Sequence, residues 1–457
     1  MTGKQKNIFT TIWIVALLSN GFLLILYYWP QSKTLMGDEI GYLFRVTQFV
    51  HGIDIERTPI WPAGYDYFLA GPVALANAIN FPRPFFFAQL IQIILWVVCG
   101  AVFWKIASHL LLSVNARLVA LALFMLNPTV MAYSHYYWPE IPHIAVFLAA
   151  LWLLIARPCS LFANAAVGVL LAVAALLKLV YLPVSLLLLV LIFVVRRARN
   201  ADLMPSLVAP LLFFAALTPA ALQNLEAHDK LMVADSSMFN AWVGLNDAQL
   251  TDLHPNAIVG QELRAYIGTA ETHNARNEVY REKIIALVKE RGLAKTAIGQ
   301  LKKQYFRLFD HRSYFTKQLP GGMSQKYKFA NIYLAKVLRF VNDTVWFLTL
   351  LGLGIGIVML LQGPLSWMHL LLGIVIYNLV VFLILHVNTR YMMQILPMLC
   401  LLGAPGLIYL WNGIFNRDLG VNLGGSLAWK NVAMGVLLSG LFLVLGFRSL
   451  FAEVVSS

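Results

Sequence analysis

The sequence predicts an all-α polytopic membrane protein with about eleven transmembrane helices. Of its 457 residues, 60% are hydrophobic and only 12% are charged. Several apolar runs reach about 20 residues, the length that a helix needs to cross the hydrocarbon of a bilayer. Polar residues lie mainly between these runs, where the loops of a multi-span protein are expected.

The order of apolar runs places the spans along the chain. They are expected near residues 8–29, 84–108, 116–134, 139–156, 161–178, 181–195, 203–222, 340–361, 366–386, 391–411 and 431–449. The first run is long and lacks the small-residue cleavage site of a signal peptide. We therefore interpret it as a retained helix.

The charges of the short loops give an orientation. Lys and Arg gather on one side of the predicted membrane at Lys4, Lys6, Lys105, Arg117, Arg157, Arg196, Arg197, Arg199, Arg417 and Lys430. The positive-inside rule makes this side cytoplasmic. The N-terminus is then expected inside and the C-terminus outside.

Two long outer loops divide the chain into three regions. Residues 1–222 form an N-terminal transmembrane module, 223–339 an outer loop region, and 340–457 a C-terminal transmembrane module. The first outer loop, about 30–83, is rich in aromatic, Pro and Gly residues and is expected to contain short juxtamembrane helices. The second loop carries about half of all Lys and Arg, which does not oppose the topology, because long loops translocate largely regardless of charge.

A basic amphipathic helix is expected in the second loop. Within 283–309, apolar residues recur at helical spacing with Lys and Arg between them. This pattern suits a helix that lies against anionic headgroups or a lipid-linked phosphate. A solvated helix packed on its own loop would give the same pattern.

The three cysteines are Cys99, Cys159 and Cys400, scattered through spans or inner loops. Their spacing indicates neither a disulfide framework nor a cysteine metal site.

The predicted topology brings a set of ionisable residues to the outer membrane face. They are Asp38, Glu39, His135, Glu140, Lys178, Arg390 and Tyr391. Charge near hydrocarbon is costly, so several such residues at one depth indicate a shared polar cavity.

Three short motifs resemble the C-type glycosyltransferases, the membrane enzymes that use polyprenyl-phosphate sugars. They are Gly37-Asp38-Glu39-Ile40-Gly41-Tyr42, Trp61-Pro62-Ala63-Gly64-Tyr65, and His386-Val387-Asn388-Thr389-Arg390-Tyr391 followed by Pro397. The chain is similar in topology to the protein O-mannosyltransferases and the lipid A aminoarabinose transferases over most of its length. The long outer loop matches no part of these enzymes that we can name.

The resemblance implies an inverting transfer of sugar from an undecaprenyl-type phosphate to an acceptor outside the cytoplasm. Asp38 would take the proton from the acceptor hydroxyl, and Glu39 would orient the acceptor or a neighbouring basic group. The two roles are open to exchange. Asp38 would also suit the cap of a helix over about 39–50, which does not exclude catalysis.

Basic residues are expected to hold the phosphate as negative charge develops on the leaving group. Arg390 is the first candidate, because a guanidinium matches phosphate bidentately, and Lys178 is the second. Arg45 shares a helical face with Asp38 and would either pair with a carboxylate or meet phosphate. Simple alternatives are an interfacial anchor for Arg390, snorkelling for Lys178 and a surface ion pair for Arg45.

The remaining candidates would bind the sugar or the acceptor. They are Tyr42, Tyr65, His135, Tyr137, Glu140 and Tyr391. The segment 133–140 combines aromatic stacking surfaces with a carboxylate, and an aromatic belt with Glu140 favoured by the helix dipole would look the same. His143 and His369 are expected to be packed or interfacial.

No cofactor is expected. Asp38, Glu39, Glu140 and His135 would suit a divalent ion, but the sequence lacks a zinc-type ligand spacing, and we predict metal-independent transfer. The expected partners are a polyprenyl-phosphate sugar, membrane lipids and a glycan, lipid or protein acceptor such as lipopolysaccharide, with no nucleic acid. The expected location is a bacterial inner membrane. Two other functions fit the composition: an O-antigen polymerase or ligase that uses Arg264, His273, Arg276 and Arg281, and a lipid-linked sugar flippase.

Overall fold

A computed structural model of the chain confirms the all-α class. It describes residues 1–28, 35, 37–53, 59–246, 259–313, 315–316, 319, 332–415 and 429–456, and all regular secondary structure within these ranges is helical. Parts of both predicted outer loops, including Met36, lie outside the described residues.

Eight of the described helical segments are long and apolar enough to cross a membrane. They are α1 (Gly3–Tyr28), α4 (Pro84–Leu110), α9 (Leu182–Ala198) with the turn η1 (Leu179–Tyr181), α10 (Val208–His228) with η2 (Met204–Leu207), α15 (Ile332–Leu361), α16 (Trp367–Ile384), α17 (Leu396–Phe415) and α18 (Trp429–Ser456). Three shorter apolar helices are α5 (Val114–Met125), α7 (Glu140–Ala156) and α8 (Leu161–Leu177). Each of the eleven predicted helices thus has a counterpart, but eight of them have the length of a span.

The predicted helix 116–134 is in fact two helices. The helix α5 ends at Met125, and α6 (Pro128–Tyr133) begins after a break. The Asn127 side chain accepts hydrogen bonds from two backbone amides of the new helix, and Pro128 takes its first position, where a missing N–H costs little. The Asn-Pro pair therefore starts a second helix inside an apolar run.

The polar regions are also helical. The first outer loop contains α2 (Glu39–Val50) and α3 (Gly64–Ala78), and the second contains α11 (Ser237–Asn246), α12 (Val259–Gly268), α13 (His273–Arg291) and α14 (Leu293–Phe309). The single basic helix predicted over 283–309 is divided between α13 and α14 at Gly292, whose φ of +80° favours glycine. In α14, Gln300 and Gln304 are buried and donate to the Gly244 carbonyl of α11.

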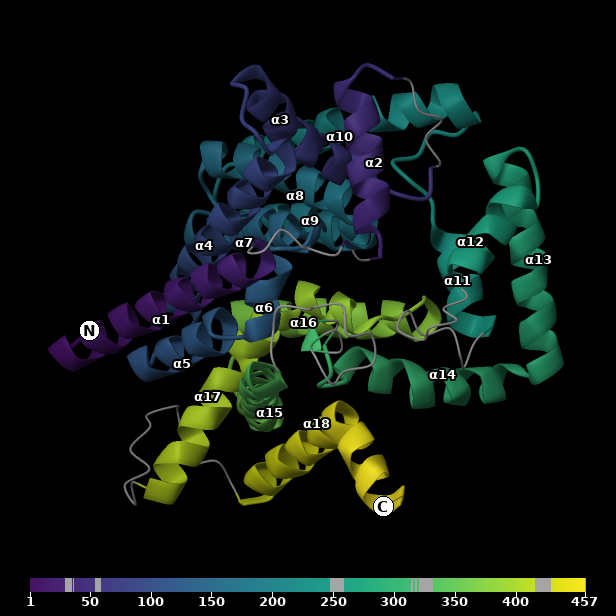
Figure 1. Ribbon diagram of the computed structural model, residues 1–457. Coiled ribbons are helices and arrows are strands. Elements are labelled where there is room, and N and C mark those ends of the chain that lie inside the picture. The colour runs from purple at the N-terminus through teal and green to yellow at the C-terminus, as the bar shows by residue number, and fades with distance from the viewer. Residues whose placement is uncertain are drawn as a thin grey trace.

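The apolar helices pack in two groups that meet along α5 and α17 (Figure 1). In the first group α4, α7, α8 and α10 pack in succession, and in the second α15 contacts both α17 and α18. The backbones of α15 and α17 approach so closely that a Cβ on Gly356 would lie 1.9 Å from the carbonyl oxygen of Leu402. Small residues at such contacts are typical of helix packing in membranes.

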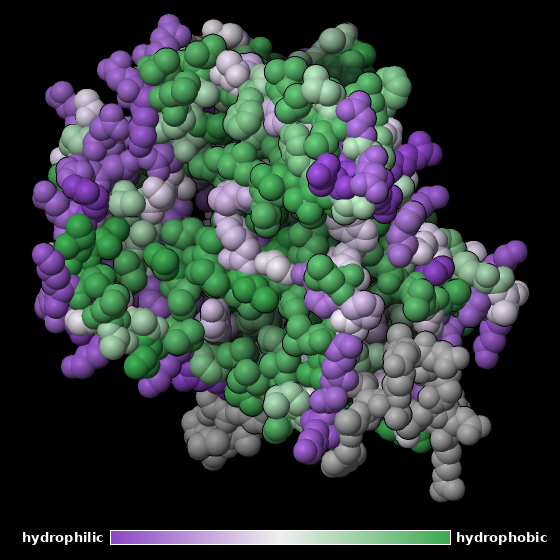
Figure 2. Space-filling model, turned by 180° about the vertical axis from the view of Figure 1, so that it is seen from behind, coloured by the Kyte–Doolittle hydropathy of each residue, from purple (hydrophilic) through white to green (hydrophobic). Residues whose placement is uncertain are grey.

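The surface separates into apolar and hydrophilic zones. Figure 2 shows a broad apolar area across the middle of one face, with hydrophilic residues gathered along the left edge and in smaller groups toward the right. The left edge corresponds to the right side of Figure 1, where α12 and α13 lie. An apolar belt between hydrophilic ends is the surface that a multi-pass membrane protein presents to lipid.

Candidate functional site

Four charged side chains from distant parts of the sequence form one chain of alternating charge. Arg390 Nη2 lies 2.5 Å from Asp38 Oδ2, and Lys178 Nζ lies 2.8 Å from Glu140 Oε1. The two pairs are joined because Arg390 Nε lies 3.9 Å from the same Glu140 oxygen. The predicted convergence of these four residues is therefore a property of the fold.

Along the chain from Lys178 through Glu140 and Arg390 to Asp38, exposure is lowest at Glu140 and highest at Asp38. Glu140 is 1% exposed, Lys178 9%, Arg390 18% and Asp38 39%. Glu39, next to Asp38, is fully buried, and its Oε1 accepts the backbone N–H of Tyr137 at 2.7 Å. Of the two adjacent carboxylates, Asp38 is thus the one that a molecule outside the protein can reach.

The start of α2 directs Asp38 toward Arg390. Asp38 stands at the N-cap position, yet among the described residues its side chain makes no hydrogen bond that caps the helix. Its backbone carbonyl accepts the amide of Tyr42, which continues the helical pattern. The alternative that Asp38 is only a helix cap is therefore not what the contacts show.

Arg390 is fixed by a short helical segment and by two aromatic rings. It lies in η4 (Thr389–Gln394), where the Asn388 side chain accepts its backbone N–H at 3.2 Å. The guanidinium carbon lies 5.1 Å from the ring centre of Trp138 and 5.5 Å from that of Tyr391. Such contacts hold the plane of the guanidinium and contribute about 0.5–2 kcal/mol each.

Lys178 lies at the turn between α8 and η1, as its predicted hairpin requires. Burial lowers the pKa of Lys178 from its usual value, and the Glu140 carboxylate beside it acts in the opposite direction. Glu140 is the first residue of α7, where the positive end of the helix dipole favours a carboxylate. Lys178 also lies 5.8 Å from the ring centre of Tyr391, so both cations border the same ring.

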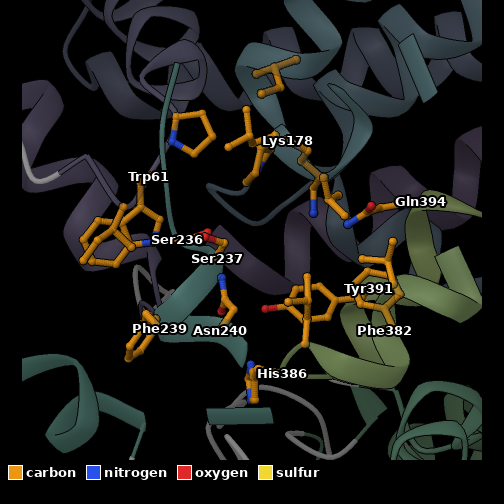
Figure 3. Close-up of a pocket in the computed structure, with 18 of the residues that line it drawn as sticks. Trp61, Lys178, Ser236, Ser237, Phe239, Asn240, Phe382, His386, Tyr391 and Gln394 are labelled. Atoms are coloured by element: carbon orange, nitrogen blue, oxygen red, sulfur yellow. The ribbon is translucent and has the colours of Figure 1, made fainter. Parts of the chain in front are cut away.

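Lys178, Arg390 and Tyr391 line a cavity of about 350 Å³, which Asp38 and Glu140 adjoin through their ion pairs with the two cations. Its charged and polar wall includes Lys178, Arg390, Ser236, Asn240, His386 and Gln394, and its apolar wall includes Val180, Pro183, Tyr377, Val381 and Leu385. Figure 3 shows Lys178, Gln394 and Tyr391 on one side, Trp61 on the other, and Ser236, Ser237 and Asn240 between them. The cavity is therefore amphiphilic, with cations beside an apolar wall formed by residues of η1, α9 and α16 and by Leu385.

No protein-family model, curated protein or solved structure matches this chain. The chemistry of the cavity follows from its own side chains. Two cations, each paired with a carboxylate, border an apolar wall that belongs to membrane-length helices. An anionic group attached to a lipid chain would satisfy both parts of such a cavity.

Arg45 is placed beside the cavity and not inside it. Its Nε lies 2.9 Å from Asp66 Oδ2, and its guanidinium lies over the rings of Tyr42 and Trp61 at 4.8 and 5.3 Å. The carboxylate that Arg45 meets is therefore Asp66 of α3 and not Asp38. Tyr42 lines the cavity, and burial, with a smaller effect of Asp38, raises the pKa of its hydroxyl.

Three predicted sugar-binding residues lie in the packing around the site. Tyr65 is buried edge-on against Tyr42, and its hydroxyl donates to Gln92 Oε1 at 2.7 Å. His135 is buried, with Nε2 3.0 Å from Asn20 Oδ1 of α1, and the Tyr137 ring packs against Phe85. Of the six predicted residues, Tyr42 and Tyr391 line the cavity, while Glu140 lies behind it.

His143 and His369, the two other histidines considered, take part in packing and in helix capping. His143 is buried in α7 between the rings of Phe147 and Tyr181. His369 joins Ser366 in a capping box at the start of α16. Among the described residues, no group of three or more His, Cys, Asp and Glu side chains has the arrangement of a metal site. Metal-independent transfer stays a prediction.

Sequence reasoning missed the contribution of the second outer loop to the cavity. Five of residues 235–240 line it, all except Met238. The Asp235 amide donates to the Pro59 carbonyl at 2.7 Å, and the His386 amide donates to the Asn240 carbonyl at 2.9 Å. One main-chain hydrogen bond thus joins the second outer loop to the first, and the other joins it to the segment before η4. A signal was present in Asp235-Ser236-Ser237, whose acidic and hydroxyl side chains often precede a helix.

Proposed function

We propose that this protein is an inverting glycosyltransferase that takes a sugar from a polyprenyl phosphate and passes it to an acceptor outside the cytoplasm. The observation that carries this function is the pairing of an accessible carboxylate, Asp38, with Arg390, a cation that lines an amphiphilic cavity. Glycosyl transfer from a lipid phosphate needs this combination: a base for the acceptor and a cation for the leaving group.

The donor would enter with its phosphate between Lys178 and Arg390. Its polyprenyl chain would extend along the apolar wall, whose helices α9 and α16 carry exposed Leu187, Val380 and Ile384 on their outer surfaces. The cations are already placed, so they would stabilise charge on the leaving phosphate without rearranging at the moment of reaction. The phosphate would share Arg390 with Asp38.

The reaction then balances with the residues of this chain. The acceptor hydroxyl oxygen forms a bond to the anomeric carbon while its proton passes to Asp38. The bond from that carbon to the phosphate oxygen breaks, and the electron pair leaves with the polyprenyl phosphate held by Arg390 and Lys178. Attack opposite the leaving group inverts the anomeric centre, so a β-linked donor gives an α-linked product.

The motifs around these residues support this assignment through their resemblance to the C-type glycosyltransferases. We propose the corresponding membrane arrangement: eleven spans, a cytoplasmic N-terminus and a site on the outer face of a bacterial inner membrane. The three shorter helices α5, α7 and α8 would then complete the spans, with α6 extending α5. The excess of Lys and Arg in the short loops on the opposite side supports this orientation.

The ligase-type alternative depends on basic residues of the second outer loop. Arg264 and Arg281 are exposed, and Arg281 pairs with Glu278 on its own helix. His273 is buried against Asp235 and Arg276 bonds to backbone carbonyls, so these two residues have structural partners. This arrangement favours Asp38 and Arg390 as the reactive pair.

The decisive experiment removes the charge of Asp38 with little change in size. Purified full-length Asp38→Asn protein would be assayed for sugar transfer from a synthetic polyprenyl-phosphate hexose, with Glu226→Gln on the exposed face of α10 as the matched control. We expect the control to be normal and Asp38→Asn to lose at least about a hundredfold, the usual contribution of a general base. A normal rate in Asp38→Asn would remove the proposed function.

A further inference from the structure

A second, larger cavity lies beside the first and shares one wall with it. Its volume is about 860 Å³, and it is bounded by α2, α10 and the start of α13. Trp61 lines both cavities, so a single indole belongs to the wall of each. This volume is within the range of sites that enclose a ligand of several rings.

The lining of the second cavity contains both hydrogen-bonding groups and aromatic surfaces. Amide side chains come from Gln223, Asn224 and Asn274, and aromatic surface comes from Phe49 and Trp61. Phe49 is 43% exposed and packs edge-on against Tyr67. Sugars present hydroxyl groups around the ring edge and apolar C–H faces above and below, so amides and aromatic rings together form a suitable surface for them.

The charges of this cavity disfavour an anionic ligand. Arg276 is engaged with the backbone, since its Nε and Nη2 donate to the carbonyls of Ala270 and Glu271 at 2.5 and 2.8 Å. The side chains of Asp229 and Glu271, in contrast, are exposed among the lining residues. A phosphorylated or sulfated ligand would be repelled by these two carboxylates, and the Arg276 guanidinium, which is bonded to the backbone, is not placed to offset the repulsion.

Hydrogen bonds of Asp235 hold the wall between the cavities. Asp235 accepts hydrogen bonds from Lys230 Nζ at 2.9 Å and Asn277 Nδ2 at 2.8 Å, and His273 Nε2 lies 3.2 Å away. The Asp235 amide also bonds to the Pro59 carbonyl, two residues before Trp61. The position of Trp61 is therefore tied to the second outer loop.

We infer that the second cavity binds a neutral oligosaccharide. This oligosaccharide is the acceptor, and one of its ends receives the sugar. Since an acceptor has meaning only for a transferase, this site rests on the proposed function. A row of stacked side chains, Trp61, Arg45 and Tyr42, leads from this cavity to the first turn of α2, where Asp38 lies. The reducing or non-reducing end of a bound chain would pass Trp61 to reach Asp38.

The test blocks the second cavity and leaves the first intact. Asn274 is exposed and lines the second cavity, so Asn274→Trp would fill the space without entering the packed interior. Ala286→Trp adds the same indole to an exposed position of α13 outside the cavity and is the control. The full chain in lipid nanodiscs would be applied to an array of neutral gluco-, galacto- and manno-oligosaccharides, together with phosphorylated and sulfated forms of the same chains.

We expect the natural protein and Ala286→Trp to retain neutral chains, and Asn274→Trp to lose at least about tenfold in affinity. Retention of no oligosaccharide, of anionic chains alone, or equal retention by Asn274→Trp would overturn the assignment. Binding of synthetic polyprenyl phosphate, measured on the same samples, separates this result from the donor site. If the natural protein retains neutral chains but does not bind polyprenyl phosphate, the proposed function is contradicted, and the second cavity remains a saccharide site.

Discussion

Arg390 and Asp38 lie 352 positions apart in the sequence, and their side chains meet at 2.5 Å. In the proposed reaction the same guanidinium must also hold the donor phosphate. The carboxylate and the phosphate would therefore share one cation, which places the proton acceptor close to the bond that breaks. This shared contact motivates the first prediction.

Arg390→Lys should lower kcat/KM for the donor by about 10²–10³, the effect of removing one donor that stabilises developing charge. The ammonium keeps the charge but loses the planar fork that reaches phosphate and Asp38 together. Initial rates over a range of donor concentrations would measure it. Arg45→Lys is the control, because Arg45 pairs with Asp66 beside the cavity. A comparable loss of kcat/KM in Arg45→Lys would show that Arg45 also takes part in binding the phosphate.

Lys178 should give the reaction an alkaline limb below the ordinary lysine pKa of about 10.4. The reason is that burial lowers the pKa of Lys178, and only the protonated amine attracts phosphate. Activity is therefore present below this lowered pKa and falls as the pH rises through it. A pH profile of donor KM would show the limb, and Lys178→Arg should move it to higher pH. An unchanged limb in Lys178→Arg would assign it to another group.

Gly64→Ala should destabilise the protein by about 1–3 kcal/mol, as overpacking usually does. A Cβ at this first residue of α3 would lie 2.5 Å from the carbonyl oxygen of Leu176 in α8. Gly71 lies in the same helix with open space around its Cβ position. Gly71→Ala should therefore be neutral or stabilising by up to about 1 kcal/mol. Thermal unfolding in detergent compares the two, and equal melting temperatures would show that α3 moves freely on α8.

Asp235 should make the folded state sensitive to acid. Although burial acts to raise its pKa, hydrogen bonds from His273, Ser237 and Lys230 hold the pKa of Asp235 well below its usual range. A carboxyl with a lowered pKa in the folded state stabilises it above the unfolded value of about 3.9, and this contribution is lost as the pH falls below that value. Asp235→Asn should lower the melting temperature at pH 7 and flatten its dependence on acidic pH. If the substitution lowers the melting temperature equally at pH 7 and at acidic pH, the loss comes from packing and not from the charge of Asp235.

Hydropathy and local signals predicted the position of most helices. The sequence predicts the helix at about 39–50 after a candidate cap, Asp38, and a turn of a hydrophobic hairpin at Lys178, and the structure has both. The break at Asn127-Pro128 was missed, because the apolar residues on both sides hide a short polar cap. Gly292 divides the second basic helix in the same way.

The partners of the site residues were harder to predict. Sequence position brought Asp38 and Arg390 to one membrane face, but their contact, and that of Lys178 with Glu140, depends on how four elements pack. Three partners were open for Arg45, namely Asp38, a phosphate or the carboxylate of a simple ion pair, and it pairs with Asp66, since α3 packs against α2. His135 and Tyr65 carry chemistry suited to a sugar, but neighbouring helices enclose them. Side-chain type indicates what a residue is able to do, while packing decides what it can reach.

The two main-chain hydrogen bonds at Pro59–Asp235 and Asn240–His386 have an evolutionary consequence. An amide and a carbonyl are supplied by almost every residue type, so these two bonds do not themselves depend on which side chains occupy the four positions. Proline at positions 235 or 386 is the exception, because it lacks the donating N–H. The frame of the cavities can therefore be inherited unchanged while the side chains around it diversify. Such a construction allows one scaffold to acquire new ligand preferences by mutation of the walls alone.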